Sequence, residues 1–371
     1  MLFLGIDQHA RQITISLRND DGDVIQSRQV STQPEKVNAF FVELTRERLR
    51  DDEEFVAVLE VCGFNEWLIE MLRNYRCHKV ILIQPEGRPK RKTYRRDAAA
   101  LSELLWVNRG RLLRGKPVRG LRQVNITSTS DREDRRLTTL RKKAGQTRTR
   151  IINAIKQMIR RHNLQWEMPT KIFPTQKATA WLKELALPKM DRMELNYLLE
   201  DLRQIDQRIE ELQQVIVERC EAREDAMLLT SMPGVSHFTA TALSCRVGDV
   251  KRFPRSKSLA NYWGLTPGCR NSGETQRLGS ITKAGSGIAR WLLAQMTHKV
   301  LRKDARLREW FKRIKRRRGS GIARVAVMRK LATIIWHMLT KQVSYVQCRH
   351  LASETETPSQ AGKLPRLRLL E

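Results

Sequence analysis

The sequence has 371 residues, of which 70 are lysine or arginine and 40 are aspartate or glutamate, for a formal net charge of +30. An excess this large favours a polyanionic partner, nucleic acid above all and an anionic membrane surface far less. The hydrophobic fraction of 40% is sufficient for buried cores, which excludes a disordered basic polypeptide for most of the chain.

Two further exclusions follow from local composition. No segment reaches the roughly 20 consecutive apolar residues of a membrane span, and the short apolar N-terminus lacks the features of a signal peptide. The six cysteines contain no Cys-x-x-Cys pair, so neither a zinc site nor a disulfide framework is expected. The chain is therefore predicted to be cytoplasmic, with no membrane partner.

Residues 1–83 alternate strand and helix patterns. The predicted strands are Leu2–Ile6, Gln12–Leu17, Val24–Val30, Phe55–Leu59 and Val80–Ile83, and the predicted helices are Gln33–Arg50 and Asn65–Tyr75. Three strands followed by helix, strand, helix and strand is the order of a ribonuclease-H-like domain, so the N-terminal domain is expected to have this α/β fold.

A basic stretch follows this pattern. Residues 88–122 contain twelve lysines and arginines against two acids, Asp97 and Glu103. Within it, Ala98–Val107 is compatible with a helix, and Pro117 and Gly120 indicate a break. The N-terminal domain with its basic extension is therefore expected to cover residues 1–125.

The remainder of the chain is predicted to be mostly helical. Residues 126–225 are expected to form two long helices around an interruption with prolines. The first begins at a cap at Ser130 or Asp131 and runs to about His162, and the second is Asp191–Glu224. The apolar spacing of the second helix suits a coiled-coil seam, either within the chain or against another subunit. Residues 226–345 are predicted to be a mostly α C-terminal domain, and residues 346–371 a disordered tail.

Two acids, Asp7 and Glu60, each end an apolar strand run. In a ribonuclease-H-like sheet these two strands are neighbours, so the carboxylates face one another and repel, and a divalent metal with oxygen ligands relieves this. Mg²⁺ (or Mn²⁺) there can activate water or a hydroxyl and stabilise charge on phosphate. The alternative for each is an ordinary solvated acid, and for Asp97 a charge favoured by the helix dipole.

Sequence blocks spread over both halves, in a fixed order, indicate a family. They are Gly5–His9, Leu59–Gly63, Lys92–Ala98, Ser231–Val235, Arg252–Phe253, Leu259–Pro267, Ser272–Gly273 and Ile281–Gly285. Together they resemble the DEDD transposases of the IS110 family of insertion sequences, relatives of the Piv invertase. The resemblance covers roughly residues 2–345.

The resemblance implies a RuvC-like N-terminal domain with four metal-binding acids. Asp7, Glu60 and Asp97 match three of them and are implied to be catalytic metal ligands. Tyr94 stands where the family pattern Lys-Thr-Asp-x-x-Asp has its first aspartate, and a neutral phenol is a poor Mg²⁺ ligand. Either three acids with water and phosphate hold the metal, or Glu103 assists, or this copy is weakened.

The resemblance also implies a nucleophilic serine in the C-terminal domain that forms a phosphoserine link to DNA. Ser272 is the candidate, in a loop beside Gly273, where Arg270, Arg277 and Lys283 could neutralise a phosphate. A serine is a weak nucleophile and needs a base or metal, which a carboxylate or metal of the first domain could supply. The alternative is an ordinary loop serine, with Ser231, Ser280 and Ser286 as replacements.

Further basic positions are candidate nucleic-acid contacts. Besides Arg270, Arg277 and Lys283, these are Arg91, Lys92, Arg95, Arg96, Lys315, Arg316 and Arg317. Trp310 and Phe311 beside the last group could stack on bases, but such aromatics more often lie in a core. The Pro233–Val235 segment resembles a helix-hairpin-helix turn, or is an ordinary turn between helices.

The resemblance implies a DNA recombinase that cuts and rejoins strands by transesterification. It further implies a structured (bridge) RNA as guide, donor and target DNA as partners, a dimer or tetramer, and association with the bacterial nucleoid. One alternative is a RuvC-type structure-specific nuclease, and another is a DNA- or RNA-binding remnant weakened at Tyr94. An RNA- or ribosome-binding structural protein would explain the charge but not the acidic blocks.

Overall fold

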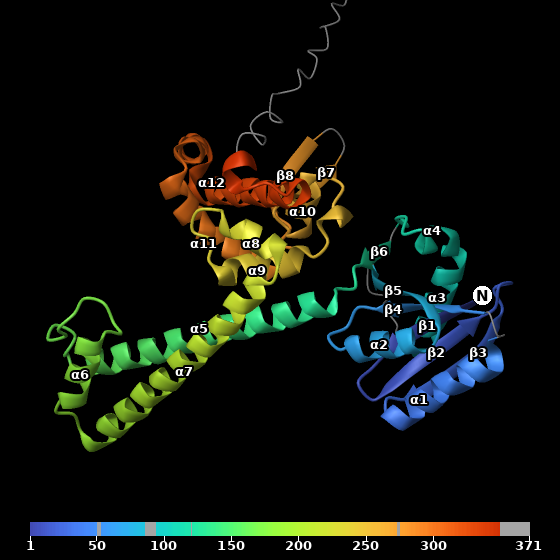
Figure 1. Cartoon of the computed structure of the whole chain (residues 1–371), viewed down its shortest axis with the longest axis horizontal. Helices are drawn as coiled ribbons and strands as arrows, with labels where there is room; N and C mark the ends of the chain where they lie inside the picture. The colour runs from blue at the N-terminus through green and yellow to red at the C-terminus, as the bar shows by residue number, and fades with distance from the viewer. Residues whose placement is uncertain (50–52, 86–93, 120, 273–274, 349–371) are drawn as a thin grey trace, which may run out of the picture. The chain divides into compact units, whose positions relative to one another are not determined.

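The computed structural model describes residues 1–49, 53–85, 94–119, 121–272 and 275–348. The chain divides into two compact units, Met1–Ile126 and Thr127–Glu371, whose elements are labelled in Figure 1. Across the described ranges, the helices are too short or too polar to span a bilayer.

Unit 1 is built on a six-stranded mixed sheet. Its strands are β1 (Leu2–Gln8), β2 (Gln12–Arg18), β3 (Val24–Ser31), β4 (Phe55–Glu60), β5 (Cys77–Pro85) and β6 (Leu121–Val124). Their order is β3-β2-β1-β4-β5-β6. Strands β1, β4 and β5 are parallel, and the other pairs are antiparallel. The expectation that the first and fourth strands are neighbours is confirmed, whereas β6 was not predicted.

Helices cover both faces of this sheet. They are α1 (Pro34–Glu43), which continues as a π-helical turn (Leu44–Arg48), α2 (Glu66–Asn74), α3 (Tyr94–Val107) and α4 (Arg109–Leu113). Strand alternation divides the core into two layers. Leu4 and Ile6 of β1 pack with Phe40 of α1, while Phe3 packs with Leu101 on the face covered by α3.

Helix α3 lies in backbone contact with β1. A Cβ atom added at Gly5 would come within 2.4 Å of the Ser102 nitrogen and 2.5 Å of the Ala98 oxygen. At the other end of α3, the Trp106 indole Nε1 donates to the Asp20 carbonyl oxygen at 2.9 Å. Asp20 follows β2, next to the start of β1, so α3 runs antiparallel to β1. Its N-terminus therefore lies toward the C-terminal end of β1.

Unit 2 begins with a long helical hairpin (Figure 1). Helix α5 (Thr129–Arg161) and helix α7 (Lys189–Glu221) pack against each other, with α6 (Gln176–Glu184) between them in sequence. The apolar stripe of α7 thus packs within its own chain, through residues such as Leu202 and Ile205.

The predicted helix bounds need two corrections. The N-cap of α5 is Ser128, rather than Ser130 or Asp131, and its hydroxyl oxygen accepts a hydrogen bond from the Asp131 backbone N–H at 3.1 Å. A serine side chain satisfies one of the free N–H groups of the first turn, which fixes the start there. The second long helix ends at Glu221, and Glu224 already begins the next one.

A buried ionic network joins the hairpin to the rest of unit 2. Arg219 of α7 donates to the fully buried Asp134 of α5 at 2.7 Å. Arg223 donates to Asp131 at 2.8 Å, to Asp134 at 2.9 Å and to Asp225 at 2.9 Å. Burial would lower the pKa of Arg223, but its hydrogen bonds to Asp225 and Asp131 outweigh this and raise it above its usual value. The acids are thus compensated, as buried charges require.

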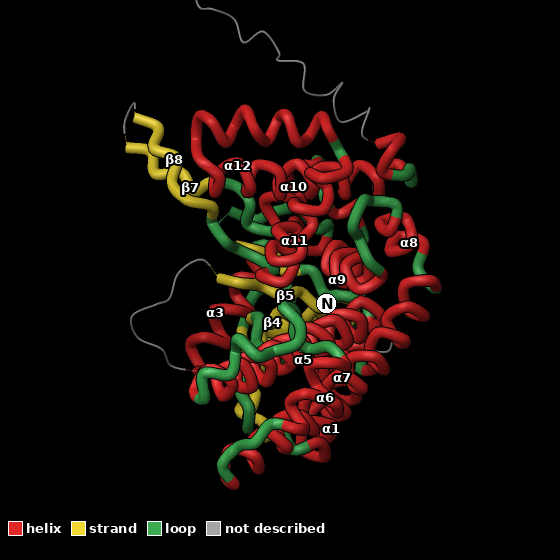
Figure 2. Tube along the Cα trace, turned by 90° about the vertical axis from the view of Figure 1, so that its left-hand side faces the viewer, coloured by secondary structure: helices red, strands yellow, loops and turns green. Residues whose placement is uncertain are grey.

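The C-terminal part of unit 2 is a helical bundle with one protruding hairpin. Its elements are α8 (Glu224–Thr230), α9 (His237–Val247), a 3₁₀ turn (Val250–Arg252), α10 (Ser256–Tyr262), β7 (Pro267–Ser272), β8 (Thr275–Ile281), α11 (Gly287–Lys303) and α12 (Ala305–Lys341). Helix α12 is kinked at Gly319, where φ is 82°. Figure 2 shows β7 and β8 standing out from the helices.

The predicted disordered tail needs one correction at its start. Gln347 and Cys348 lie in a helical turn, and the Cys348 side chain is fully buried in the core of the bundle. Burial of an apolar thiol ties this turn to the bundle. Residues 349–371 lie outside the described part of the chain.

We expect Gly5→Ala to destabilise unit 1 by about 1–3 kcal/mol, because the added methyl group pushes the backbone of α3 away from β1. Urea unfolding of the purified chain measures this. Gly110→Ala in α4 is the matched control, since its Cβ would meet no atom within 4 Å. Equal stability of the two variants would show that the contact is not tight.

Candidate active site and nucleic-acid surface

Asp7 and Glu60 occupy neighbouring positions at one edge of the sheet. Strands β1 and β4 are parallel, with Ile6 beside Leu59, so Asp7 and Glu60 come next in register at the two C-terminal ends. Residues in register on adjacent parallel strands point to the same face and lie about 5 Å apart. Strand alternation places both on the face covered by α3, because Phe3 shares that face.

The N-terminus of α3 lies toward the same edge. Asp97 is in its first turn and is partly buried, and the neighbouring Ala98 touches β1 at Gly5. Tyr94 is the first residue of α3, three positions before Asp97. The topology thus directs Asp97 and position 94 toward the end of β1 that carries Asp7.

Hydrogen bonds hold the ends of β1 and β4 together. The Asn65 amide Nδ2 donates to Gln8 Oε1 at 2.8 Å and to the Glu60 carbonyl oxygen at 3.1 Å. The Cys62 backbone N–H in turn donates to Asn65 Oδ1 at 2.6 Å. Asp7 Oδ2 lies 3.0 Å from His9 Nε2. Asn65 and His9 were not expected from the sequence, because neither belongs to a spacing typical of metal ligands.

The carboxylate oxygens of Asp7 and Glu60 suit a hard cation, although the described residues do not form a complete metal site. Among the described residues, no three His, Cys, Asp or Glu side chains form a group ready to hold a metal ion. Mg²⁺ commonly takes one or two protein carboxylates and completes its shell with water and substrate phosphate. Asp7 and Glu60, in register on one face, provide carboxylate oxygens of that kind.

Ser272 lies at the end of a strand, whereas the sequence indicated an open loop. It is the last residue of β7 and pairs with Thr275 of β8, and Arg270 pairs with Arg277. The backbone pairing thus places the Ser272 position two residues along β7 from the Arg270–Arg277 pair.

The base of this hairpin is clamped by an arginine. The Arg290 guanidinium donates to the carbonyl oxygens of Trp263 at 3.0 Å, Ala284 at 2.8 Å and Gly285 at 3.3 Å. A Cβ at Gly264 would lie 2.3 Å from the Ala284 oxygen, so the two loops that flank the hairpin touch backbone to backbone. The sequence carried no signal for Arg290, because its partners are backbone groups of other segments.

The other predicted cations lie at several places. Lys283 is exposed at the end of the hairpin, with a left-handed φ of 54°. Arg95 and Arg96 are in the first turn of α3. The exposed basic group on α12 is Lys315, Arg316 and Arg317. Arg91 and Lys92 lie outside the described residues. Trp310 and Phe311 are partly buried against the bundle core, which favours a packing role.

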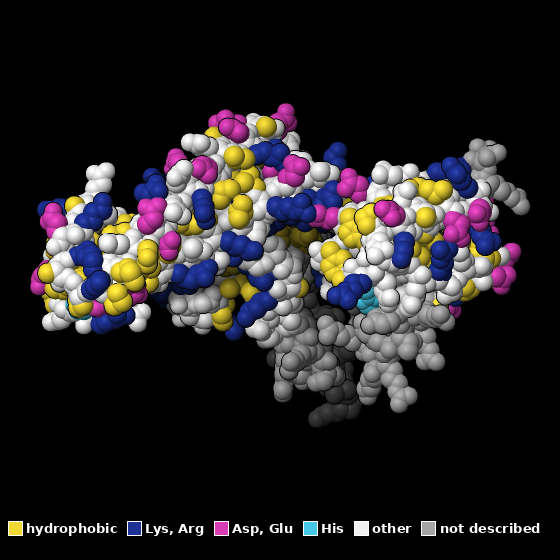
Figure 3. All heavy atoms as spheres, turned by 90° about the horizontal axis from the view of Figure 1, so that it is seen from below, with side chains coloured by type: hydrophobic (Ala, Val, Ile, Leu, Met, Phe, Trp, Pro, Cys, Tyr) yellow, Lys and Arg dark blue, Asp and Glu magenta, His cyan; other side chains and the backbone are white. Residues whose placement is uncertain are grey.

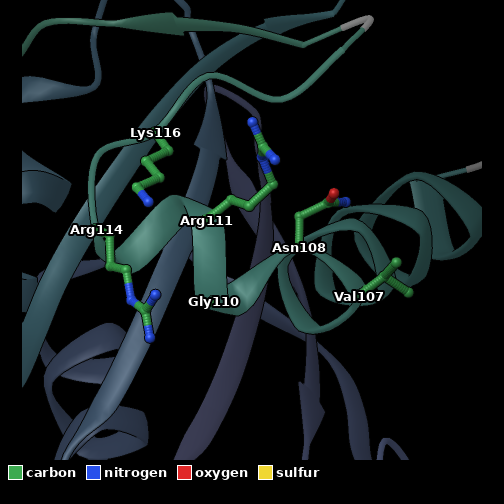
Figure 4. Close-up of a pocket in the computed structure, with 6 residues that line it drawn as sticks. All are labelled: Val107, Asn108, Gly110, Arg111, Arg114 and Lys116. Carbon is green, nitrogen blue, oxygen red and sulfur yellow. The ribbon is translucent and has the colours of Figure 1, made fainter.

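Unit 1 has a cationic hollow that was not singled out from the sequence. It has a volume of about 350 Å³ and is lined by Val107, Asn108, Gly110, Arg111, Arg114 and Lys116. Figure 4 shows that its three cations come from α4 and the segment after it. The Arg111 guanidinium is fixed by donating to the Pro117 carbonyl oxygen at 3.0 Å. The basic extension therefore has an ordered cationic surface.

The segment that resembles a helix-hairpin-helix turn does lie between two packed helices. It connects α8 to α9, and Gly234 has a left-handed φ of 79°. A side chain there would collide with Lys299, whose Cβ would be 2.4 Å from the added atom. Glycine is thus required at the turn by both its φ and its packing.

Sequence comparisons relate this chain to transposases. The sequence model of the Transposase IS116/IS110/IS902 family matches residues 226–312. The transposase for insertion sequence element IS1111A of Coxiella burnetii is 30% identical over 260 residues, 68% of each chain. A probable family 20 transposase of Pseudomonas aeruginosa is 31% identical over 158 residues, 41% of this chain and 46% of that relative. The putative transposase y4pF/y4sB of Sinorhizobium fredii is 25% identical over 308 residues, 79% of this chain and 74% of that relative.

A mixed sheet with carboxylates at one edge, followed by a strongly basic helical unit, defines a protein that acts on nucleic acid. The chain belongs to the IS116/IS110/IS902 family of transposases. The family expected from the sequence blocks is confirmed at this level. The matched stretch, residues 226–312, contains the whole β7–β8 hairpin and its clamp.

We expect Arg290→Met to lower DNA strand cleavage by about 100-fold while leaving DNA affinity unchanged, because a misplaced reacting group costs rate rather than binding. Arg290→Lys should restore part of the rate. Cleavage and filter binding are measured on the same preparations. Arg208→Met, which removes an exposed charge from α7, is the control, and an equal loss in both variants would refute the clamp.

Proposed function

We propose that this transposase cuts and rejoins DNA by transesterification, with Ser272 as the nucleophile and Asp7, Glu60 and Asp97 as the acids of a RuvC-like unit 1. The observation that carries the proposal is the sheet register, with Asp7 beside Glu60 on the face covered by α3. The order β3-β2-β1-β4-β5 is the one expected of a ribonuclease-H-like sheet.

The chemistry assigned to unit 2 is nucleophilic attack on a phosphodiester. The Ser272 hydroxyl oxygen forms a bond to phosphorus, and the bond from phosphorus to the leaving 3′ or 5′ oxygen breaks, so one phosphodiester replaces another. The hydroxyl proton passes to a base, and the leaving oxygen takes up a proton. Arg270 and Arg277, paired across the hairpin, would offset the charge that develops on the phosphate oxygens.

In this proposal Mg²⁺ or Mn²⁺ is the cofactor and would be held by Asp7 and Glu60 with Asp97. When bound it would supply positive charge next to the reacting phosphate. The protein's own contribution is to hold together the two strand ends that carry these carboxylates, through the sheet register and the Asn65 hydrogen bonds to Gln8 and to the Glu60 carbonyl oxygen. An oxygen-only donor set favours these hard ions over zinc.

Target choice is assigned in the same proposal to a structured guide RNA. A protein that delegates sequence choice to base pairing requires mainly backbone contacts, which the net charge of +30 can provide. Rejoining two strands requires at least two active sites, so a dimer or tetramer is proposed as the working form. Copurification of RNA tests the guide, and the mass of the complex in solution tests the dimer or tetramer.

One feature favours a second candidate, a DNA- or RNA-binding remnant with weakened catalysis. Tyr94 begins α3, three residues before Asp97, at the position where the family pattern has an acid. A phenol stays neutral near pH 7 and adds no charge for a metal. A chain that binds nucleic acid tightly but does not cut it would match this candidate.

We expect the native chain, given Mg²⁺, the DNA ends of its element and any copurifying RNA, to form a covalent protein–DNA adduct. Ser272→Ala should abolish the adduct because the attacking oxygen is gone, and Asp7→Ala should lower it by at least about 100-fold. Denaturing gels with labelled DNA measure this. Cleavage that persists in Ser272→Ala would instead support a hydrolytic RuvC-type nuclease.

A separate expectation concerns the tyrosine. Tyr94→Asp should lower the Mg²⁺ concentration needed for half-maximal cleavage, because a fourth carboxylate adds a charged oxygen ligand. Tyr94→Phe is the matched control and should behave like the native chain. If only Tyr94→Asp cleaves while the native chain does not, the remnant is the correct description.

A further inference from the structure

Three helices of unit 2 bring two cations and two aromatic rings together. The Arg141 guanidinium of α5 lies 5.8 Å from the ring centre of Phe238 in α9. The Lys142 ammonium, also of α5, lies 5.3 Å from the ring centre of Trp291 in α11. The two rings contact each other edge to face, with centroids 6.4 Å apart. We call these four residues the cation–aromatic platform.

The cations of the platform have no counterion within the described residues. No acid lies within ion-pair distance of Arg141 or Lys142, whereas Arg148, two turns further along α5, is paired with Asp206. The Arg141 Nε atom is shielded from solvent and has no hydrogen-bond partner. Burial, with a smaller contribution from Arg148, lowers the pKa of Arg141. This arrangement costs stability and would be relieved by an anion from outside the chain.

The platform is ordered and accessible at the same time. Cation–π contacts hold the two charged groups over the rings, so less side-chain freedom is lost when an anion binds. The Trp291 side chain is 38% exposed, and both cations are partly exposed. Such a site suits a charged partner that approaches from solvent.

The positive surface continues from the platform to the start of α9. Phe238 is in the first turn of α9, whose N-cap is Ser236, and a helix N-terminus favours anions. On α11, Lys299 lies two turns beyond Trp291 and donates to the Gly234 carbonyl oxygen at 3.4 Å. Figure 3 shows lysine and arginine side chains on one face of the molecule, mixed with apolar and acidic ones.

We propose that the cation–aromatic platform binds the phosphate backbone of double-stranded DNA, as a contact separate from the Ser272 hairpin. The proposal deepens the proposed function and rests on it for the choice of DNA. A phosphodiester fits this site because its negative charge is spread over two oxygens, so that two fixed cations can both contact it. Such contacts do not depend on the base sequence. An acidic protein is a less suitable partner than DNA. The chain has a net charge of +30 and belongs to a family of transposases, so DNA is the polyanion that it is expected to bind.

The test is the salt dependence of affinity for a DNA duplex of unrelated sequence. Each phosphate contact contributes about 0.9 to the slope of log K against log salt, so the Arg141→Gln/Lys142→Gln double variant should lose about 1.8. Lys143→Gln is the matched control, because this exposed neighbour projects from another side of α5 and should leave the slope unchanged. Arg141→Lys/Lys142→Arg keeps both charges and should keep the slope.

Several outcomes would overturn the proposal. These are an unchanged slope in the double variant, an equal loss in Lys143→Gln, or a loss seen with an RNA hairpin and not with duplex DNA. Thermal melting shows that each variant is folded, and the charge-keeping variant separates loss of charge from loss of packing. The covalent adduct tests the nucleophile assignment, whereas the salt slope on duplex DNA tests the platform, so failure of one is distinguished from failure of the other.

Discussion

The backbone contact between α3 and β1 is the constraint on which the candidate acid site depends. Only glycine at position 5 allows the Ala98 and Ser102 backbone to lie so close to the strand. This contact, with the Trp106 hydrogen bond at the far end, fixes the direction of α3. The direction brings Asp97 and Tyr94 toward the edge where Asp7 and Glu60 end their strands. The packing requirement at Gly5 thus positions Asp97 relative to the acids at the strand ends.

A comparable constraint holds the serine in unit 2. The Arg290 guanidinium donates hydrogen bonds to backbone carbonyl oxygens of two loops. Gly264 and Gly285 allow those loops to lie in contact. The β7–β8 hairpin therefore leaves the bundle from a rigid base, although it stands out from the helices. In the proposed function, this base would set the direction of the strand that carries Ser272.

Two groups of charges in unit 2 differ in their surroundings. Arg219 and Arg223 are matched to Asp131, Asp134 and Asp225, and this buried network joins the hairpin to the bundle. At the surface, Arg141, Lys142 and the basic group of α12 (Lys315, Arg316 and Arg317) have no ion-pair partner among the described residues. Each buried acid of this network has a charged partner, as burial requires, whereas cations without an acidic partner at the surface are available to a polyanion.

The sequence by itself determined five strands of the sheet, the neighbouring first and fourth strands, the two long helices of residues 126–225 and the family, because these depend on local periodicity and on blocks in order. It did not determine β6, the cap at Ser128, the strand position of Ser272, the Arg290 clamp or the cation–aromatic platform. Each of these joins segments that are distant in sequence or depends on backbone partners. Periodicity describes which face of one element is apolar, and only the tertiary structure decides what that face meets.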